Sequence, residues 1–437
     1  MRKELRRLFL TASLLVNTSL IESSVYEYFP KKLEPTSSIF GITGILQMPN
    51  ARLMQEGSMK IGYSSSFPYE YTYITEGTNN TQEKCDYLLN IPQPDQRTKE
   101  WYEFRHNHIT ASNAWKCLGT PSSVNQIILE KNLTEIDMVE IAEDFFISLG
   151  FQPLPQSFWD RSLFVKPADR DVVCHASAWN LDSMDDLRIK MCIEKNEEDF
   201  STIHHELGHI FYYQAYKDQP SVFQRGANDG FHEAVGDLLT LSITPNYLEQ
   251  IGFATPEEAE SAKENQIAFL MKKALDSVVA TPWTLMLDKW RMAVFNGELN
   301  EDELNDYWWE LREKYQGVKA PNERPDDAFD PGAKYHVPGN TPYTRYYLAR
   351  ILQYQFHESL CEQIGFEGPL HECSIYGNEI AGESLRSMLS LGQSEPWQDA
   401  LESIIGTREL SGTAMLNYYA PLKDWLDEQN QGRDCGW

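Results

Sequence analysis

The sequence predicts a mainly α protein that begins with an irregular segment rich in strands and loops. From about Leu133 onward, apolar residues recur at helical spacing through long stretches that Gly, Pro and Asn clusters separate. Residues 25–95 are instead rich in Tyr, Ser, Thr, Pro and Asn, and short alternating runs such as SMKIGYSSS are typical of strands. The composition, 41% hydrophobic and 24% charged over 437 residues, is that of a globular protein with a large core.

Six stretches support the helical prediction. The first, LTEIDMVEIAEDFFISLGF, has a capping-type residue, Thr134, followed by acids and by apolar residues at helical spacing. The others, in chain order, are DFSTIHHELGHIFYYQAY, GFHEAVGDLLTLS, EEAESAKENQIAFLMKKALDSVV, EDELNDYWWELREKYQG and TRYYLARILQYQFHESLCEQIG. We expect three parts along the chain: a signal-like leader (1–24), a composite segment of unclear fold (25–130) and a helical domain (131–437).

The charge balance argues against a nucleic-acid partner. Lys and Arg number 38 and Asp and Glu number 65, so the formal charge is −27 and the chain as a whole repels phosphate. No run of 18 apolar residues occurs, and we predict no transmembrane helix. The first 24 residues have four basic residues and then the apolar run Leu8–Val16, which resembles a secretory signal. The alternative is an amphipathic N-terminus.

The seven cysteines contain no CxxC pair, so a thiolate zinc site is not expected. Cys174 and Cys192, like Cys361 and Cys373, are close in sequence and could close short loops as disulfides. Disulfides would suit a secreted protein, but cysteine spacing alone fixes no connectivity.

The stretch from 203 to 239 contains a candidate metal site. His205 and His209 enclose Glu206 in an HExxH pattern, and on a helix residues four apart lie on one face, where two imidazoles can reach one zinc ion. Glu206 can then hold a water molecule and take its proton. The alternative is an ordinary helix with a polar face.

A second helical stretch, GFHEAVGD, supplies the other acids. Glu233 and Asp237 are again four apart, so Glu233 can complete a His-His-Glu ligand set and Asp237 can fix the tautomer of a ligand histidine. Solvation on an exposed face is the alternative for each acid. For His204 and His232 we expect ordinary structural roles, because each neighbours a better-placed residue and points elsewhere.

These residues lie within a longer resemblance. HHELGHIFYYQAYKDQP and RGANDGFHEAVGDLLTLS look like the angiotensin-converting enzyme family of peptidyl-dipeptidases. The match continues in FWDRSLFVKPADRDVVCHASAWN, WWELREKYQG, FDPGAKYHVPGNTPYTRYYLARILQYQFHESLC and SGTAMLNYYAPLKDWL, and it covers about residues 133–428. The resemblance implies a large helical lobe of a zinc metallopeptidase that is activated by chloride and cleaves dipeptides from the free C-terminus of oligopeptides. It also implies a secreted or membrane-associated protein.

The resemblance further assigns substrate contacts. Lys334 and Tyr343 match the family residues that bind the substrate carboxylate. His175 and His336 match histidines that hydrogen-bond the substrate backbone, beside the main chain of Ala176, and we group His336 with the catalytic residues. From the residues alone, Tyr343 would be an aromatic on a helix face and Lys334 a solvated loop lysine.

It also assigns an oxyanion donor, chloride sites and disulfides. Tyr346 matches a tyrosine that donates to the tetrahedral oxyanion. Arg345 matches a chloride-site arginine, and Trp308 with Arg312 matches part of another chloride site. The pairs Cys174/Cys192 and Cys361/Cys373 fall where the family forms disulfides.

Two alternatives remain open. A catalytic domain of the family is longer, so we expect its N-terminal lobe to be absent, and the chain could be a non-catalytic zinc-binding fragment from a composite gene model. Residues 38–73 resemble the start of a bacterial outer-membrane exopolysaccharide protein, and Arg97–Gly119 resembles the opening motif of phage-type recombination exonucleases. The net charge of −27 and the missing downstream nuclease residues argue against a nuclease.

Overall fold

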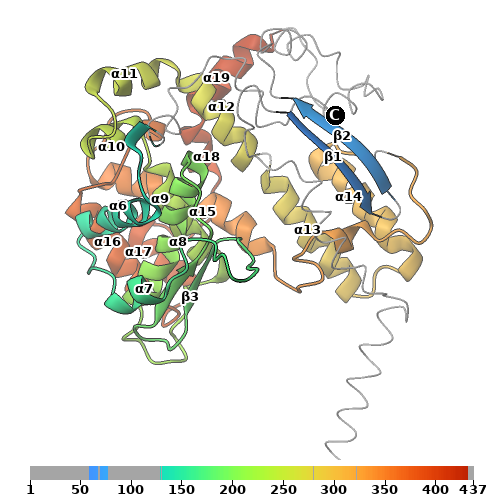
Figure 1. The fold of residues 1–437 in the computed structure, drawn as a ribbon, viewed down its shortest axis with the longest axis horizontal. Helices are drawn as coiled ribbons and strands as arrows, with labels where there is room; N and C mark the ends of the chain where they lie inside the picture. The colour runs from blue at the N-terminus through green and yellow to red at the C-terminus, as the bar shows by residue number, and fades with distance from the viewer. Residues whose placement is uncertain are drawn as a thin grey trace, which may run out of the picture. The chain divides into compact units, whose positions relative to one another are not determined.

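The computed structural model describes residues 128, 130–278, 280–320 and 322–431, together with the backbone of two N-terminal strands. These strands, β1 (Met59–Ser66) and β2 (Tyr69–Glu76), pair in a two-stranded sheet (Figure 1). The strand predicted at SMKIGYSSS is therefore confirmed. The signal-like leader and most of residues 25–130 lie outside the described residues.

The regular structure of the remaining described chain is almost entirely helical, which confirms the predicted fold class (Figure 1). The helices are α6 (Glu135–Ser148), α7 (Gln156–Arg161), α8 (Glu197–Ala215), α9 (Asp229–Leu241), α10 (Pro245–Gln250), α11 (Pro256–Glu264), α12 (Gln266–Ser277), α13 (Ala280–Phe295), α14 (Leu304–Gln316), α15 (Thr344–Gln363), α16 (Glu379–Ser390), α17 (Trp397–Ile405), α18 (Thr413–Tyr418) and α19 (Ala420–Gln429). A short hairpin of β3 (Ser177–Asn180) and β4 (Leu187–Lys190) pairs antiparallel.

The chain divides into two compact units. The described helices before residue 324 and after residue 341 lie in one unit, which contains the hydrophobic core. Residues 324–341 lie in the other unit.

Local sequence signals account for several helix starts. Thr134, the predicted cap, forms a capping box with Asp137 at the start of α6: the Thr134 hydroxyl accepts a hydrogen bond from the amide of Asp137, and the Asp137 carboxylate accepts one from the amide of Thr134. The stretch EEAESAKENQIAFLMKKALDSVV forms two helices instead of one. Asn265 leaves the helical conformation between α11 and α12, and its side chain donates to the carbonyl of Ser261.

Helices α8, α9 and α15 form the centre of the larger unit, with α9 packed against both others (Figure 1). Two glycines allow the backbones of α8 and α9 to approach closely. A Cβ atom on Gly208 would lie 2.7 Å from the Cα atom of Gly236. Elsewhere in the core, the rings of Phe146 on α6 and Phe211 on α8 stack with their centroids 4.1 Å apart. The β3–β4 hairpin also packs against α8.

Both disulfides implied by the family resemblance are present. Cys174 and Cys192 are joined, with Cα atoms 5.1 Å apart, and Cys361 and Cys373 are joined, with Cα atoms 6.3 Å apart. Among the described residues, no helix is both long and apolar enough to cross a membrane.

Candidate metal centre

Three ligand-type atoms from α8 and α9 converge on one point. The Nε2 atoms of His205 and His209 lie 3.2 Å apart, and Oε2 of Glu233 lies 3.5 Å and 3.9 Å from them. Tetrahedral zinc with bonds of about 2.0–2.1 Å requires ligand atoms about 3.3 Å apart. The separations therefore suit a zinc ion, and so does the donor set of two imidazole nitrogens and one carboxylate oxygen.

The charge of the cluster also favours a cation. Three carboxylates, from Glu206, Glu233 and Asp237, lie in a largely buried region, and the guanidinium of Arg350 is 3.5 Å from Asp237. Buried carboxylates are costly unless a positive charge compensates them. A divalent ion would supply that compensation.

The two helices set the ligand geometry. His205 and His209 are one helical turn apart on α8, and Glu233 faces them from α9. A Cβ atom on Gly236 would lie 2.7 Å from Nδ1 of His205. The absence of a side chain at Gly236 therefore makes room for the first ligand ring.

Asp237 lies behind His205, as predicted. Its Oδ1 atom is 3.0 Å from Nδ1 of His205, and its Oδ2 atom faces Nη1 of Arg350. When Nδ1–H of His205 donates to Asp237, the lone pair of Nε2 points to the converging ligand atoms. The sequence interpretation missed Arg350 because its contact depends on how α15 packs on α9.

Glu206 is buried beside the ligands, with 7% of its surface exposed. Burial raises the pKa of its carboxyl group, while the charges of His205 and His175 act in the opposite direction. His175 and Ala176 directly precede β3, and the His175 ring donates from Nδ1 to the carbonyl of Ala176 at 2.7 Å. His175 therefore lies near enough to Glu206 for its charge to act on that carboxyl group.

The expectation that the side chain points away from the site is confirmed for His204 and wrong for His232. His204 is fully buried and donates from Nδ1 to the carbonyl of Phe200 at 2.8 Å. His232 does not point away from the site, because its Nδ1 atom lies 3.3 Å from Nδ1 of His209. Its Nε2 atom lies 3.1 Å from the hydroxyl of Tyr216. The pattern shows only that His232 adjoins Glu233, so its ring direction could not be predicted.

The first turn of α15 presents Tyr343, Arg345 and Tyr346. An acid on α13 holds this turn: Oδ2 of Asp288 accepts the amides of Tyr343 and Thr344 at 2.7 Å and 2.6 Å. Burial raises the pKa of Tyr346, and the charges of Glu233 and Glu206 raise it further. Tyr346 therefore lies in the electrostatic field of the metal-centre carboxylates, whereas Tyr343 packs its ring against Tyr346 at 4.8 Å.

The predicted chloride residues occupy two places. Arg345 donates from Nη2 to Oδ2 of Asp229 at 3.0 Å. Trp308 and Arg312 lie together on α14, where both contact the ring of Trp283; the Arg312 guanidinium carbon is 4.7 Å from its centroid. Arg345 therefore already has an anionic partner.

Lys334 and His336 belong to the unit of residues 324–341, and their position relative to the metal centre stays a prediction. Lys334 follows the 3-10 turn Asp330–Ala333, and the carbonyl of His336 accepts the amide of Thr341 at 3.0 Å. Arg324 and Asp330 form a bidentate ion pair within this segment.

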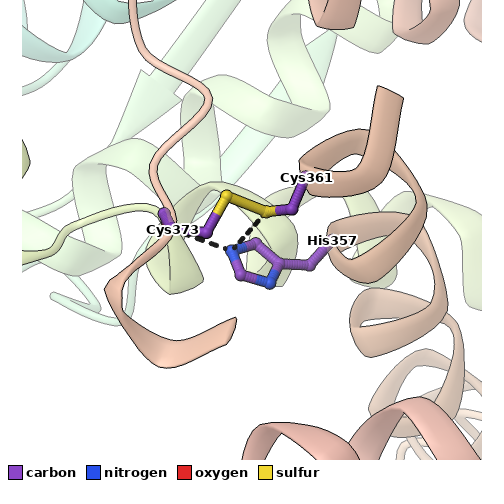
Figure 2. A group of neighbouring side chains, drawn as sticks. All are labelled: His357, Cys361 and Cys373. Atoms are coloured by element: carbon purple, nitrogen blue, oxygen red, sulfur yellow. Dashed lines mark hydrogen bonds between the residues drawn. A yellow bond between two sulfur atoms is a disulfide. The ribbon is translucent and has the colours of Figure 1, made fainter. Parts of the chain in front are cut away.

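A second group of metal-ligand types is explained by its disulfide. Figure 2 shows His357 with Cys361 and Cys373, whose three ligand-type atoms lie within 4.8 Å of one another. The two sulfurs are bonded to each other, and Nε2 of His357 donates to the carbonyl of Cys373 at 3.2 Å. With both sulfurs in the disulfide, this group offers no thiolates to a metal.

Zinc binding is expected to release about one proton at neutral pH. Burial opposes protonation of His205, but the hydrogen bonds to Asp237 and Glu233 and the charges of Asp237 and Glu206 together outweigh burial and raise the pKa of His205 well above the ordinary value. The pKa of His209 is lowered to about 4, by burial and by the charge of His205. Below the pKa of His205, a proton on this ring therefore competes with zinc.

Calorimetric titration in buffers of different ionisation enthalpy measures this proton. Between pH 6 and 8, we expect the apparent affinity to fall about tenfold per pH unit as the pH is lowered. Asp237→Asn removes a hydrogen bond that raises the pKa of His205, so it should flatten the slope. A pH-independent affinity in the unmodified chain would contradict the prediction.

Comparison with known proteins agrees with this geometry. The family model described as angiotensin-converting enzyme matches residues 98–437, starting ahead of the motifs that begin near Leu133. The chain is 44% identical over 316 residues to angiotensin-converting enzyme of Bos taurus and 46% identical over 316 residues to that of Oryctolagus cuniculus, covering 71% of this chain and 24% of each relative. It is 42% identical over 315 residues to that of Theromyzon tessulatum, covering 72% of this chain and 51% of the relative.

Proposed function

This chain belongs to the angiotensin-converting enzyme family of peptidases, and from that membership we propose a zinc metallopeptidase that releases dipeptides from the C-terminus of oligopeptides. One observation carries the proposal. His205, His209 and Glu233 present three ligand atoms at zinc-like separations, with Glu206 beside them on the same helix. The chain spans about a quarter to a half of the length of these relatives, so the activity of the whole enzyme is a proposal for this chain.

Bound zinc would polarise the scissile carbonyl and lower the pKa of a water molecule. Glu206 takes the proton of that water and passes it to the leaving amine nitrogen. The raised pKa of Glu206 suits this exchange, because a carboxyl group with a pKa nearer neutrality both accepts and returns a proton readily. The hydroxyl of Tyr346 donates to the developing oxyanion.

The substrate contacts follow the same family pattern. Lys334 and Tyr343 bind the free C-terminal carboxylate, since a cation and a neutral donor together recognise an anionic end group. His175, the main chain of Ala176 and His336 hydrogen-bond the peptide backbone. The electrostatic effect of His175 on Glu206 supports this assignment for His175.

An extracellular location, secreted or membrane-associated, is part of the proposal. Its support is the pair of disulfides, Cys174–Cys192 and Cys361–Cys373, because such bonds persist in oxidising compartments.

Chloride activation, through Arg345 and through Trp308 with Arg312, is also proposed. The ion pair of Arg345 with Asp229 supports a specific test, because the carboxylate competes with chloride for the same guanidinium. We expect Asp229→Asn to lower the half-activating chloride concentration about 1.5- to 5-fold, the range for an exposed ion pair.

The measurement is peptidase rate against chloride concentration at constant ionic strength. Asp427→Asn is the matched control, because Asp427 also pairs with a cation, Lys423, and is similarly exposed, at 65% against 69% for Asp229. An unchanged chloride curve for Asp229→Asn would show that the pair and the anion do not compete.

The function is tested by incubating the purified chain with an N-blocked tripeptide and identifying the products by mass. Zinc-dependent release of an intact dipeptide, abolished by a chelator, is the expected result. The same tripeptide with a C-terminal amide should be cleaved slowly, because it lacks the carboxylate that Lys334 and Tyr343 bind. Release of single amino acids would contradict the proposed reaction.

A second candidate function is zinc binding without peptidase activity. The observation that favours this second function is that the chain spans only 24% to 51% of the length of these relatives. One zinc ion bound per folded chain with no dipeptide released would select it. Turnover that requires zinc would exclude it.

A further inference from the structure

The two ligand histidines have different partners behind them. Asp237, a carboxylate, lies behind Nδ1 of His205 at 3.0 Å, and His232, a second imidazole, lies behind Nδ1 of His209 at 3.3 Å. We infer that His232, held by Tyr216, is the positioning residue that orients His209 for the metal. This inference rests on the proposed zinc site and adds a residue to which no role was assigned.

The hydrogen-bond directions follow from the ligand geometry. Nε2 of His209 faces His205 and Glu233, so its lone pair must be free for the metal and its proton must sit on Nδ1. That Nδ1–H donates to Nδ1 of His232, which must therefore be unprotonated. The His232 proton then sits on Nε2 and donates to the hydroxyl oxygen of Tyr216 at 3.1 Å. Each group in this chain fixes the tautomer of the next.

The surrounding residues hold the His232 ring in this direction. Its centroid lies 4.3 Å from that of Tyr212 and 5.0 Å from that of Tyr213. On the loop before α9, a Cβ atom on Gly226 would lie 2.8 Å from Cδ2 of His232. The ring therefore has little room to turn, and the hydrogen bond to His209 costs little conformational entropy.

The alternative is that His232 only fills space among these aromatic rings. Phenylalanine at position 232 keeps the ring and its packing but offers no acceptor to Nδ1 of His209. Asparagine at this position places an amide oxygen near the location of the imidazole Nδ1, so it keeps the acceptor and loses the contact with Tyr216. Packing alone would make phenylalanine the milder change, whereas positioning would make asparagine the milder one.

The experiment measures zinc affinity by competition with a chromophoric chelator. His232→Phe should weaken zinc binding about 10- to 100-fold, the usual cost of losing a partner behind a metal ligand. His232→Asn should stay within about threefold of the unmodified chain, and Tyr216→Phe should lie between the two variants. Cobalt in place of zinc gives a second readout, because the visible bands should shift in His232→Phe and stay in place in His232→Asn.

His204→Phe is the matched control. It replaces another buried histidine that makes two hydrogen bonds, to the Phe200 carbonyl and the Tyr247 hydroxyl, but its ring contacts neither His205 nor His209 through a nitrogen. It should lower the melting temperature and leave zinc affinity unchanged. An affinity of His232→Phe within about threefold of the unmodified chain would overturn the inference.

A measurement on the unmodified chain covers the case in which His232→Phe does not fold. In zinc-loaded protein with 15N-labelled histidine, NMR should show protonated Nδ1 in His209, and unprotonated Nδ1 with protonated Nε2 in His232. Protonated Nδ1 in His232 would overturn the inference while leaving the zinc site intact. Failure of the unmodified chain to bind zinc would instead overturn the proposed function together with the inference.

Discussion

Glu206→Gln is expected to lower kcat/KM for dipeptide release by about 10²–10⁴-fold, the usual contribution of a general acid–base residue. Glutamine keeps the size of the side chain but neither accepts a proton from water nor returns one to the leaving amine. Glu206 contributes none of the three atoms that converge on the metal position, so zinc affinity should change little. The variant therefore separates catalysis from metal binding.

Rate and zinc content must be measured on the same preparation of Glu206→Gln. Glu198→Gln is the matched control, because Glu198 is an exposed glutamate in the first turn of the same helix. It should retain nearly full activity. If Glu206→Gln kept more than about a tenth of the activity, another group would have to move the proton, and the proposed role of Glu206 would be wrong.

The fold and the convergence of the candidate ligands were predictable because both depend on local spacing. The HExxH pattern places His205 and His209 one turn apart whatever surrounds them, and the second helix places Glu233 and Asp237 in the same way. The structure brings these four residues together as expected. The pairing of Asp237 with His205 in particular was anticipated from helix geometry and the needs of a ligand histidine.

The groups behind the ligands could not be predicted, because their positions do not depend on local spacing. The His232 ring lies beside His209 and Tyr212 of α8 because α9 packs against α8. No spacing rule gives the direction of that ring. Asp288 is 55 residues away in the sequence from Tyr343, whose amide donates a hydrogen bond to its carboxylate. Such contacts follow from packing between elements, which a single sequence does not reveal.

Gly208→Ala is expected to destabilise the fold and weaken zinc binding together. The added Cβ atom would lie 2.7 Å from Cα and 2.9 Å from the amide nitrogen of Gly236. These are backbone atoms, so no change of side-chain rotamer relieves the clash, and α8 must move away from α9. Inserted methyl groups in close-packed cores cost about 1–3 kcal/mol, which exceeds the gain of about 1 kcal/mol or less from alanine in a helix.

The same movement would separate the ligands, because His205 and His209 lie on α8 and Glu233 on α9. A misplacement of about 1 Å can lower an enzymatic rate about 10²-fold, so dipeptide release should fall together with zinc affinity. Thermal unfolding measures the loss of stability, and chelator competition measures the loss of zinc affinity. Gly412→Ala is the control, since a Cβ atom on Gly412 meets nothing within 4 Å and its φ angle of −75° suits alanine.

Gly236→Ala tests the ligand geometry more directly than Gly208→Ala does. Its Cβ atom would lie 2.7 Å from Nδ1 of His205, the atom that faces Asp237, as well as 2.8 Å from the carbonyl oxygen of His205. It should therefore reduce zinc affinity more than Gly208→Ala does at a similar loss of stability. Equal zinc affinities in both variants and the unmodified chain would mean that the close approach of α8 and α9 does not set the ligand geometry. The distance between the two helices would then have to be ascribed to the core side chains alone.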